Sequence, residues 1–452
     1  MFSRVLVANR GEIAVRVIRA LHELGVEAVA VYSTADRDAL HVQLADQAVC
    51  IGPPAAADSY LRIPNVVAAA ETTGCEAVHP GYGFLAENAE FVRACEDNNV
   101  AFIGPTADVV ARMGDKVRAK EAMRAAGVPL VPGSDGAASL PDLRRAARDA
   151  GFPVLLKASA GGGGKGMRIV HSDDELDAAY GSASAEADAA FGDGSLYVEK
   201  VLSPARHVEI QVLCDGRGGV LTLGERECSI QRRHQKLIEE SPSPALDSAI
   251  REAMESAAER ACVSIGYRNA GTFEFLVGPD GGFHFIEVNC RLQVEHPVSE
   301  LVTGVDIVRE QIRIAAGEPL ELTGRALRRG HAIEIRINAE DPSRGFLPAP
   351  GTVTRFLPPL GPGVRVDTGV REGDEIPPFY DSMIAKVIVA DETRDTAISR
   401  ALRALGELEI EGIPTTREVA LDVLGSHEFR SGEYSTSTLT DLAGRVPSLS
   451  AT

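Results

Sequence analysis

Two acidic strands carry the residues best suited to metal chemistry. The segment "TFEFLVGPDGGFHFIEVNCR" predicts a β-hairpin, because two alternating runs flank the turn sequence "GPDGG". A register with Val277 opposite His284 separates the apolar side chains from the polar ones. In that register Glu274 faces Glu287, and Asn289 projects from the same face. Two carboxylates and an amide oxygen are hard ligands that suit Mg²⁺ or Mn²⁺, so the hairpin is a candidate metal site.

The alternative interpretation is an exposed acidic face that is neutralised by Arg291. In the same register the other face of the hairpin carries only apolar side chains, namely Phe273, Phe275, Ile286 and Val288. That face is too apolar to be the one in contact with water, and we favour the metal site.

A second candidate site is the glycine-rich segment "VLLKASAGGGGKGMRIV". It is not a P-loop, because Gly166 follows Lys165 where Ser or Thr is required, and it lacks the following helix of a dinucleotide fingerprint. The pattern predicts strand, glycine loop, strand: a flap whose backbone N–H groups can cover phosphates. A plain flexible hairpin is the alternative.

Further polar residues fall into three patterns. The segment "ERECSIQRRHQK" gathers basic side chains that are either solvated or bind an anion: Arg226, Arg232, Arg233, His234 and Lys236. The strands "HVEIQV" and "AIEIRIN" each have one fully polar face, which is either exposed or the floor of a cleft. Glu295 follows the acidic hairpin, where a base near the metal is expected, and Lys157 lies in an apolar strand, where an ammonium can meet phosphate. Cys228 and Cys290 lack an evident partner base and are expected to be packing residues.

The composition narrows the class of protein. The 452 residues include 46 Lys and Arg against 65 Asp and Glu, a net charge of −19 that argues against a nucleic-acid partner. Seven scattered cysteines without a C-x-x-C pair predict reduced thiols. The sequence shows neither a signal peptide nor an apolar run long enough for a membrane span. We expect a cytoplasmic enzyme with no membrane association.

The elements that position these residues begin with alternating strands and helices. Residues 5–8 and 28–32 predict strands on either side of a helix over 12–24, and "EAVHPGY" and "VAFIGP" predict later strands of the same parallel sheet. This is the pattern of a doubly wound α/β domain. A Pro/Gly linker follows at 128–136, and the pattern is rich in strands from residue 202 onwards.

The longer motifs resemble those of biotin carboxylase, in its order and over nearly the whole chain. They include "VANRGEIAVRVIRA", "HPGYGFLAENAEF", "KASAGGGGKGMR", "EVNCRLQVEHPVSELVTG", "RINAEDP" and "YDSMIAK". The resemblance implies the ATP-grasp fold, with an N-terminal doubly wound α/β domain (1–113), a linker helix (114–130), a glycine-loop lid (131–201), an α+β C-terminal domain (202–446) and a frayed tail (447–452). It also implies carboxylation of biotin from ATP and bicarbonate through carboxyphosphate, with Mg²⁺ or Mn²⁺.

The resemblance also assigns site residues. Those implied to contact ATP are Lys116, Lys157, Glu199, Lys200, Leu202, His207, Gln231 and His234, with Gly162, Gly163, Gly164 and Lys165 over the phosphates. The implied metal ligands are Glu274, Glu287 and Asn289, and the implied bicarbonate pocket is Lys236, Arg291, Gln293 and Val294. Glu295 corresponds to the base and Arg336 to the residue that stabilises the biotin enolate, while Tyr82 and Gly83 lie where biotin approaches. Lys236, Arg291, Glu295 and Arg336 are thus the expected catalytic residues.

Two positions depart from the family pattern: Cys290, where Thr or Pro is usual, and Thr416, where Asn is usual. We expect little effect from Cys290 because it points away from the metal ligands. The chain has no Met-Lys-Met biotinylation motif, so we predict a separate biotin carrier protein and a separate carboxyltransferase subunit of an acyl-CoA carboxylase of fatty acid biosynthesis. The resemblance implies a homodimer. The alternatives are an ATP-grasp ligase with another acceptor, similar to carbamoyl-phosphate synthetase, and a nucleotide-binding regulator without catalysis.

Overall fold

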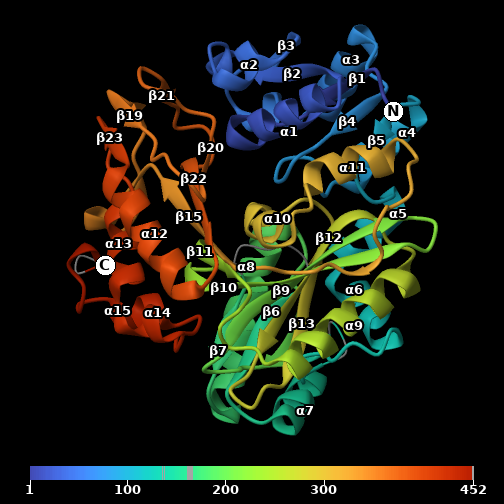
Figure 1. The fold of residues 1–452 in the computed structure, drawn as a ribbon. Coiled ribbons are helices and arrows are strands. Elements are labelled where there is room, and N and C mark those ends of the chain that lie inside the picture. Colours follow the sequence, from blue (N-terminus) through green and yellow to red (C-terminus); the bar gives the residue numbers. More distant parts are fainter. Residues whose placement is uncertain (135, 137, 160–165, 450–452) are drawn as a thin grey trace.

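The computed structural model describes residues 1–134, 136, 138–159 and 166–449, and it begins with a parallel sheet (Figure 1). The strand order is β3-β2-β1-β4-β5, so the chain first winds to one side of β1 and then crosses to the other. This is the predicted doubly wound arrangement, in which ligands bind beyond the carboxyl ends of the two central strands. The elements are β1 (Arg4–Val7), α1 (Gly11–Glu23), β2 (Glu27–Ser33), α2 (Leu40–Leu44), β3 (Gln47–Gly52), α3 (Ile63–Thr73), β4 (Ala77–His79), α4 (Ala89–Asp97) and β5 (Ala101–Phe102).

The helix α1 packs because its apolar residues recur on one face. Ile13, Val17, Ile18 and Leu21 are fully buried, at the spacing expected for a helix with one apolar stripe. Each such side chain contributes about 1.5–3 kcal/mol when it is removed from water. The helix ends before Gly25, whose φ of +71° lies in the region that glycine adopts without strain.

Two helices rather than one connect this sheet to the next unit. The predicted linker helix 114–130 is the shorter α6 (Lys116–Ala125), and α5 (Ala107–Gly114) precedes it directly. Asp115 separates them because its carboxylate accepts the N–H groups of Val117 and Arg118 and so caps α6. Gly127, with a φ of +68°, and the following Val-Pro sequence end the helical segment early.

The predicted lid is a small antiparallel sheet with the strand order β7-β6-β8, low in Figure 1. β6 (Val154–Ala158) pairs with β7 (Arg168–Val170) and with β8 (Leu196–Lys200). The helices α7 (Leu140–Ala150) and α8 (Leu176–Phe191) belong to this unit. The predicted strand pair on either side of the glycine loop is therefore confirmed, whereas the glycines themselves lie outside the described residues: Gly162, Gly163, Gly164, together with Lys165.

A nine-stranded sheet forms the centre of the molecule. Its order is β13-β12-β9-β10-β11-β15-β22-β20, with the short β14 paired to β10. All neighbours on the main path are antiparallel. The strands are β9 (Arg206–Asp215), β10 (Val220–Arg232), β11 (Gln235–Ser241), β12 (Arg268–Val277), β13 (Phe283–Asn289), β14 (Gly324–Arg325), β15 (His331–Asn338), β20 (Val364–Thr368) and β22 (Met383–Asp391).

Helices and short strands complete this part of the chain. The apolar faces of β15 and β22 form one core with α12, in which Ile333, Ile335 and Ile337 are fully buried. The remaining elements are α9 (Ser248–Ile265), α10 (His296–Thr303), α11 (Ile307–Ala315), β16 (Glu340–Asp341), β17 (Leu347–Pro348), β18 (Gly351–Thr352), β19 (Arg355–Leu357), β21 (Glu375–Ile376), α12 (Arg394–Glu407), β23 (Glu409–Glu411), α13 (Arg417–Gly425), α14 (His427–Ser431), α15 (Thr438–Leu442) and single 3₁₀ turns. Within the described residues, no helix is long and apolar enough to cross a membrane.

The end of the chain is packed further than predicted. Residues 447–449 form a 3₁₀ turn rather than the start of a frayed tail. Leu449 is buried in the same core as α13, and the backbone N–H and hydroxyl of Ser448 both donate to Asp422. Leu449 and Ser448 thus anchor the described part of this segment, and neither residue stands out in its Ser- and Pro-rich sequence.

The acidic hairpin has the predicted register over only half its length. Glu274 lies opposite Glu287, as predicted. Nearer the turn the pairing shifts by one residue, so that Val277 lies opposite Phe283 rather than His284. The extra residue is Ile286, which forms a bulge. Phe285, rather than Ile286, therefore lies opposite Phe275 on the buried face.

Candidate functional site

The acidic hairpin brings oxygen donors of two strands together. The amide nitrogen of Asn289 donates to Glu274 at 2.9 Å and approaches Glu287 at 3.5 Å. Burial and the facing Glu274 carboxylate raise the pKa of Glu287 above its ordinary value. Like charges placed opposite each other in a sheet are destabilising without compensation, and a divalent cation supplies that compensation. The donor set of two carboxylates and an amide oxygen fits Mg²⁺ or Mn²⁺.

Cations of the protein already surround one of these carboxylates. The Nε2 atom of His207 lies 2.8 Å from Oε2 of Glu274, and Nζ of Lys236 lies 3.0 Å from Oε1. Burial alone would raise the pKa of Glu274, but Lys236 and His207 outweigh it and hold the pKa well below its ordinary value. Glu274 is therefore an ionised carboxylate, the form that ligates a metal.

Glu295 is fully buried between two cations. Nζ of Lys236 donates to its Oε1 at 2.6 Å, and the guanidinium of Arg336 donates to its Oε2 at 2.8 Å. Burial alone would raise the pKa of Glu295, but Lys236 and Arg336 hold it well below its ordinary value. Arg336 also donates to Glu239 at 2.6 Å, so both cations are shared with other carboxylates. A carboxylate so placed is ionised, which is the form that a base must have before it takes up a proton.

The polar face of β9 is the floor of this site rather than an exposed surface. Glu209 and Gln211 are fully buried. Arg226 of β10 donates to Glu209 at 2.5 Å, to Gln211 at 2.7 Å, and to the hydroxyls of Ser299 and Thr272 at 3.1 Å. Arg226 is fully buried among these acceptors, so its role is to hold the floor of the site together.

The predicted basic cluster does not converge on one ligand. Of its members, Lys236 enters the site, while Arg232 donates to the carbonyl of Gly345 and stacks on Phe346. Arg233 and His234 form the exposed turn between β10 and β11, with φ values of +48° and +67°. The five side chains therefore do not gather at one place, because strand alternation and the turn point them in different directions, and anion binding by Lys236 stays a prediction.

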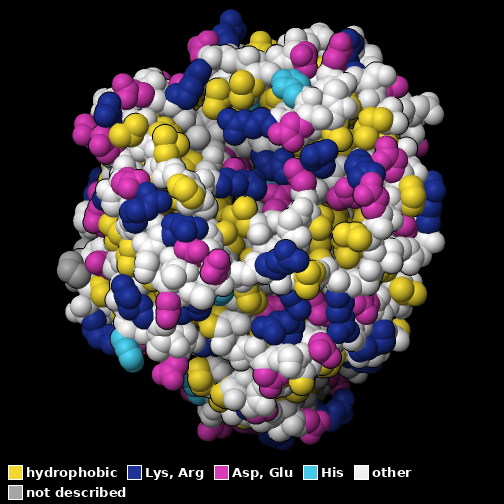
Figure 2. Space-filling view, viewed as in Figure 1, with side chains coloured by type: hydrophobic (Ala, Val, Ile, Leu, Met, Phe, Trp, Pro, Cys, Tyr) yellow, Lys and Arg dark blue, Asp and Glu magenta, His cyan; other side chains and the backbone are white. Residues whose placement is uncertain are grey.

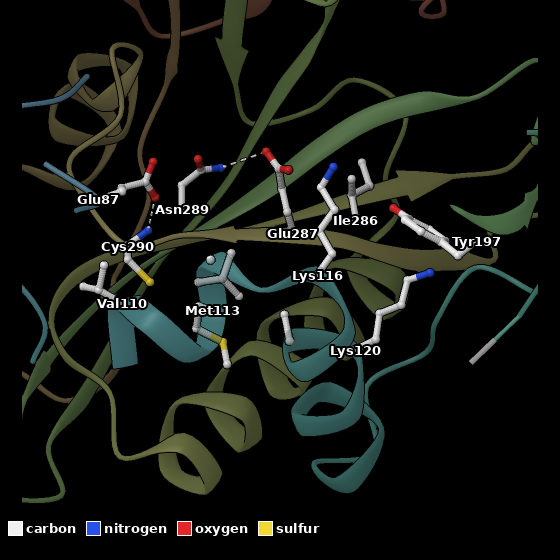
Figure 3. A pocket seen from close by; sticks show the side chains of 13 residues that line it. Glu87, Val110, Met113, Lys116, Lys120, Tyr197, Ile286, Glu287, Asn289 and Cys290 are labelled. Atoms are coloured by element: carbon white, nitrogen blue, oxygen red, sulfur yellow. Dashed lines mark hydrogen bonds between the residues drawn. The ribbon is translucent and has the colours of Figure 1, made fainter. Parts of the chain in front are cut away.

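A cavity of about 210 Å³ lies beside the acidic hairpin (Figure 3). Lys116 of α6 and Glu287 of β13 point toward the same space, and the bulged Ile286 lines it as well. Lys120 also lines the cavity, and it forms an ion pair at 2.5 Å with Glu199 of β8, which Lys157 approaches at 2.9 Å. Lys157 was singled out in the sequence and Lys120 was not. The cavity thus joins the metal-type carboxylates to a group of lysines.

Arg291 connects the hairpin to the N-terminal unit. Its Nε donates to Glu87 at 2.9 Å, and its Nη2 donates to the side-chain oxygen of Asn289 at 2.8 Å. Its Nη1 donates to Gln293 at 2.7 Å, and the side-chain amide of Gln293 in turn donates to Glu274 at 3.0 Å. Val294 follows in the same loop, next to Glu295. The residues predicted for a bicarbonate pocket therefore lie together beside the metal-type carboxylates.

The loop after β4 brings Tyr82 and Gly83 to the same region. It begins at the switch point of the N-terminal sheet, where β4 and β1 end. The side chain of Asn9 donates to the carbonyls of Pro80 and Tyr82, each at 2.7 Å, and the hydroxyl of Tyr82 donates to Glu12. Figure 2 shows side chains of both charges gathered where the N-terminal sheet, β15 and β22 meet.

Three residues predicted for ATP contact are less closely joined to this cluster. The ammonium of Lys200 donates to the carbonyls of Gly151 and Phe152. Leu202 is half-buried between β8 and β9, and Gln231 is half-buried at the end of β10, opposite Lys236. Both predicted packing cysteines are buried: Sγ of Cys228 lies 3.9 Å from Glu295, and burial raises the pKa of the Cys290 thiol to about 12.

Sequence reasoning did not assign several contacts of the site. Glu87, Lys120 and Glu239 each bind a residue that was predicted to be functional. Thr416, noted only as a departure, accepts from the backbone of Asn338 and donates to the carbonyl of Arg336. The polar period-2 pattern pointed to one face of these strands, but the partners of each residue come from distant segments.

The fold and the acidic site define an ATP-grasp enzyme, and comparison with known proteins specifies the family. Models of the biotin carboxylase N-terminal domain, the ATP-binding domain of the carbamoyl-phosphate synthase L chain and the biotin carboxylase C-terminal domain match residues 1–110, 115–323 and 334–441. The biotin carboxylase of Nostoc sp. is 55% identical over 443 residues, covering 98% of this chain and 99% of that protein. Biotin carboxylase 1 of Bacillus subtilis is 54% identical over 97% of this chain and 98% of that protein. The chain belongs to the biotin carboxylase family.

Solved structures agree with this placement. A biotin carboxylase–β,γ-ATP complex from Campylobacter jejuni has a TM-score of 0.95 at 48% identity and covers 98% of this chain and 99% of its own. The biotin carboxylase domain dimer of Hydrogenobacter thermophilus 2-oxoglutarate carboxylase, solved with MgADP, ADP and bicarbonate, has a TM-score of 0.94 at 49% identity and covers 98% of both chains. The ATP-grasp fold predicted from the sequence is thereby confirmed.

Proposed function

We propose that this chain carboxylates biotin held on a separate carrier protein, using ATP and bicarbonate, as the first half-reaction of an acyl-CoA carboxylase. The observation that carries the proposal is the position of Glu295. It is a fully buried carboxylate clamped between Lys236 and Arg336, and Lys236 also binds the metal-type residue Glu274. A base, two anion-binding cations and a metal site thus share one contiguous network.

The nucleotide is proposed to bind along the cavity beside the hairpin. Lys116 of the cavity lining and Lys157 supply positive charge for the phosphates, and Glu199 binds Lys157 together with Lys120 of the lining. Glu274, Glu287 and Asn289 would hold Mg²⁺, which neutralises charge on the phosphate oxygens when it is bound. From the sequence, Gly162 to Gly164 and Lys165 are proposed to cover the phosphates and exclude water.

Bicarbonate is proposed to bind to Lys236, Arg291 and the Gln293–Val294 loop. Glu295 accepts its proton, and the freed oxygen attacks the γ-phosphorus of ATP. The bond from that phosphorus to the bridging oxygen breaks, so ADP leaves and carboxyphosphate forms. The attack brings two anions together, and the fixed positive charge of Lys236 and Arg291 lowers the cost of that approach.

Carboxyphosphate then separates into CO₂ and phosphate. The phosphate takes the N1′ proton of biotin, and N1′ attacks CO₂ to give carboxybiotin. Arg336 is proposed to stabilise the enolate oxygen through charge-assisted hydrogen bonds, and Tyr82 and Gly83 to line the approach of biotin. The acceptor is the point that separates this proposal from a ligase similar to carbamoyl-phosphate synthetase.

We also propose the organisation in which the chain acts. The domain division 1–113, 114–130, 131–201 and 202–446 follows from the sequence motifs. A cytoplasmic location is proposed from the scattered cysteines without a C-x-x-C pair, and a biotin carrier protein and a carboxyltransferase subunit are proposed because no Met-Lys-Met motif occurs in the sequence. A relative in Methanothermobacter thermautotrophicus, 53% identical, bears the name of one of the subunits of pyruvate carboxylase, which supports a role within a carboxylase of several chains. The Hydrogenobacter domain dimer supports a homodimer.

The test is ADP release from Mg-ATP and bicarbonate, with and without free biotin. We expect release to require bicarbonate and to rise when biotin is added. Release that depends on bicarbonate but is indifferent to biotin would support carboxyphosphate formation and contradict the choice of acceptor. Release that ignores bicarbonate would contradict both steps.

A further inference from the structure

The ammonium of Lys386 joins segments that the site description leaves separate. Lys386 lies on β22, opposite Arg336 of β15, and is fully buried. Its Nζ donates to the backbone carbonyl of Val294 at 2.8 Å and lies 3.2 Å from Oε1 of Glu12. Asp367 of β20 is a more distant carboxylate, at 4.0 Å. A residue of the "YDSMIAK" motif to which the reaction assigns no role thus contacts the loop that carries Glu295.

Glu12 extends this contact to the other side of the site. It lies at the start of α1, is 5% exposed, and accepts a hydrogen bond from the hydroxyl of Tyr82 on the same Oε1 that faces Lys386. Burial and the Glu12 carboxylate raise the pKa of Tyr82 well above its ordinary value, so the hydroxyl keeps its proton and remains a donor. The path Val294–Lys386–Glu12–Tyr82 therefore connects the bicarbonate loop to the biotin loop.

A contribution to stability does not by itself explain why Lys386 and Glu12 form a buried ion pair. Replacing a buried ion pair by apolar residues of similar size is often neutral or stabilising. The reason is that the free energy needed to remove two charges from water offsets much of their mutual attraction. Here the hydrogen bonding of the buried carboxylates around Lys386 is also incomplete. Among the described residues, Oε2 of Glu12 and both carboxylate oxygens of the nearby Glu334 have no hydrogen-bond partner. What the pair does achieve is geometric, because its two well-placed contacts both end on loops of the site.

We propose that Lys386 and Glu12 are positioning residues that fix the bicarbonate loop and the biotin loop relative to each other. Lys386 holds the carbonyl of Val294 and with it the backbone that carries Glu295. Glu12 holds Tyr82. The inference rests on the proposed function of these two loops. Because a catalytic group must be held within a fraction of an ångström, loss of either contact affects the substrate on its own side.

The test uses the full chain and three variants: Lys386→Met, Glu12→Gln and the double variant. We expect Lys386→Met to raise the KM for bicarbonate by about tenfold, the loss typical of one hydrogen bond to a charged group, with the KM for ATP within about twofold. We expect Glu12→Gln to raise the KM for free biotin by a similar factor and to leave biotin-independent ATP hydrolysis unchanged. If Lys386→Met does not fold, the double variant, which removes both charges, carries the test and shows both increases.

A matched control separates positioning from stability. Arg394→Met breaks another buried ion pair, between α12 and Glu240 of β11, and is expected to lower Tm without changing either KM. Variants of the Lys386–Glu12 pair that lower Tm as Arg394→Met does but leave the KM for bicarbonate and the KM for biotin unchanged would overturn the inference. Variants that raise every KM equally would overturn it as well. A wild-type enzyme that does not respond to biotin would instead overturn the proposed function, so the two failures are distinguishable.

Discussion

Replacing Glu295 by Gln is the sharpest test of the reaction centre. The change preserves shape but removes the negative charge that lies 2.6 Å from Lys236 and 2.8 Å from Arg336. An amide cannot accept a proton from bicarbonate, and a general base contributes about 10²- to 10⁴-fold to a rate. At about 1.4 kcal/mol for each tenfold, this is a loss of about 3–5 kcal/mol of transition-state stabilisation.

The same structure bounds the cost in stability. Lys236 keeps Glu209 and Glu274, and Arg336 keeps Glu239, so neither cation is left alone. The amide oxygen of Gln can still accept one of the two hydrogen bonds, and the loss is therefore about 1.5–3 kcal/mol, the range for one bond to a charged group. The folded state should survive.

The assay compares bicarbonate-dependent ADP release with ATP binding. We expect release by Glu295→Gln to fall by at least about 10² while the Kd for ATP stays within about twofold. The control is Glu240→Gln, a buried carboxylate that binds Arg394 and His331 outside the site. It should lose stability and keep turnover. Release by Glu295→Gln within about threefold of wild type would refute the assignment of the base.

Three further predictions follow from the same contacts. Lys236→Ala should raise the KM for bicarbonate by about tenfold or more, because it removes the ammonium 2.6 Å from Glu295; a change confined to the KM for ATP would contradict this. Glu287→Gln should raise the Mg²⁺ concentration for half-maximal ADP release by about tenfold, since it removes one charged ligand; an unchanged Mg²⁺ midpoint would speak against the metal site. Burial lowers the pKa of His41 to about 4, so below about pH 6.5 the unfolded chain binds a proton that the folded chain refuses, and stability falls as the pH falls. His41→Gln should therefore lose about 3 kcal/mol less free energy of unfolding than wild type between pH 6.5 and pH 4, measured by urea titration at each pH; parallel curves would contradict the prediction.

Much of the fold and part of the site were predictable from local patterns. The pairing of Glu274 with Glu287 followed from the requirement that apolar side chains share one face of the hairpin. The predicted register is wrong near the turn, because a bulge at Ile286 inserts one residue there. The alternation of apolar and polar residues does not reveal such a bulge. Periodicity therefore placed the candidate ligands correctly and misplaced the residue beside them.

The remaining contacts depend on neighbours that are distant in sequence. The guanidinium of Arg226 is saturated by four protein acceptors, whereas Arg232 of the same segment turns to a different loop. The amino-acid sequence of the basic segment does not distinguish Arg226 from Arg232, because their hydrogen-bond partners are set by the strands and loops that pack on either side. Glu87 and Lys386 are similar cases, with partners 204 and 92 residues away.

The continuous central sheet has a consequence for how the protein can be divided. The ATP-binding family model ends at residue 323 and the C-terminal model begins at residue 334, yet β11 and β15, which lie on opposite sides of that boundary, pair directly. A cut there would leave each fragment with a newly exposed edge strand, β11 or β15, whose outward N–H and C=O groups have no partner and can pair with another chain. The boundary between the two family models is thus not a boundary between independently folding units. Fragments made there should be recovered in soluble form only when they are produced together.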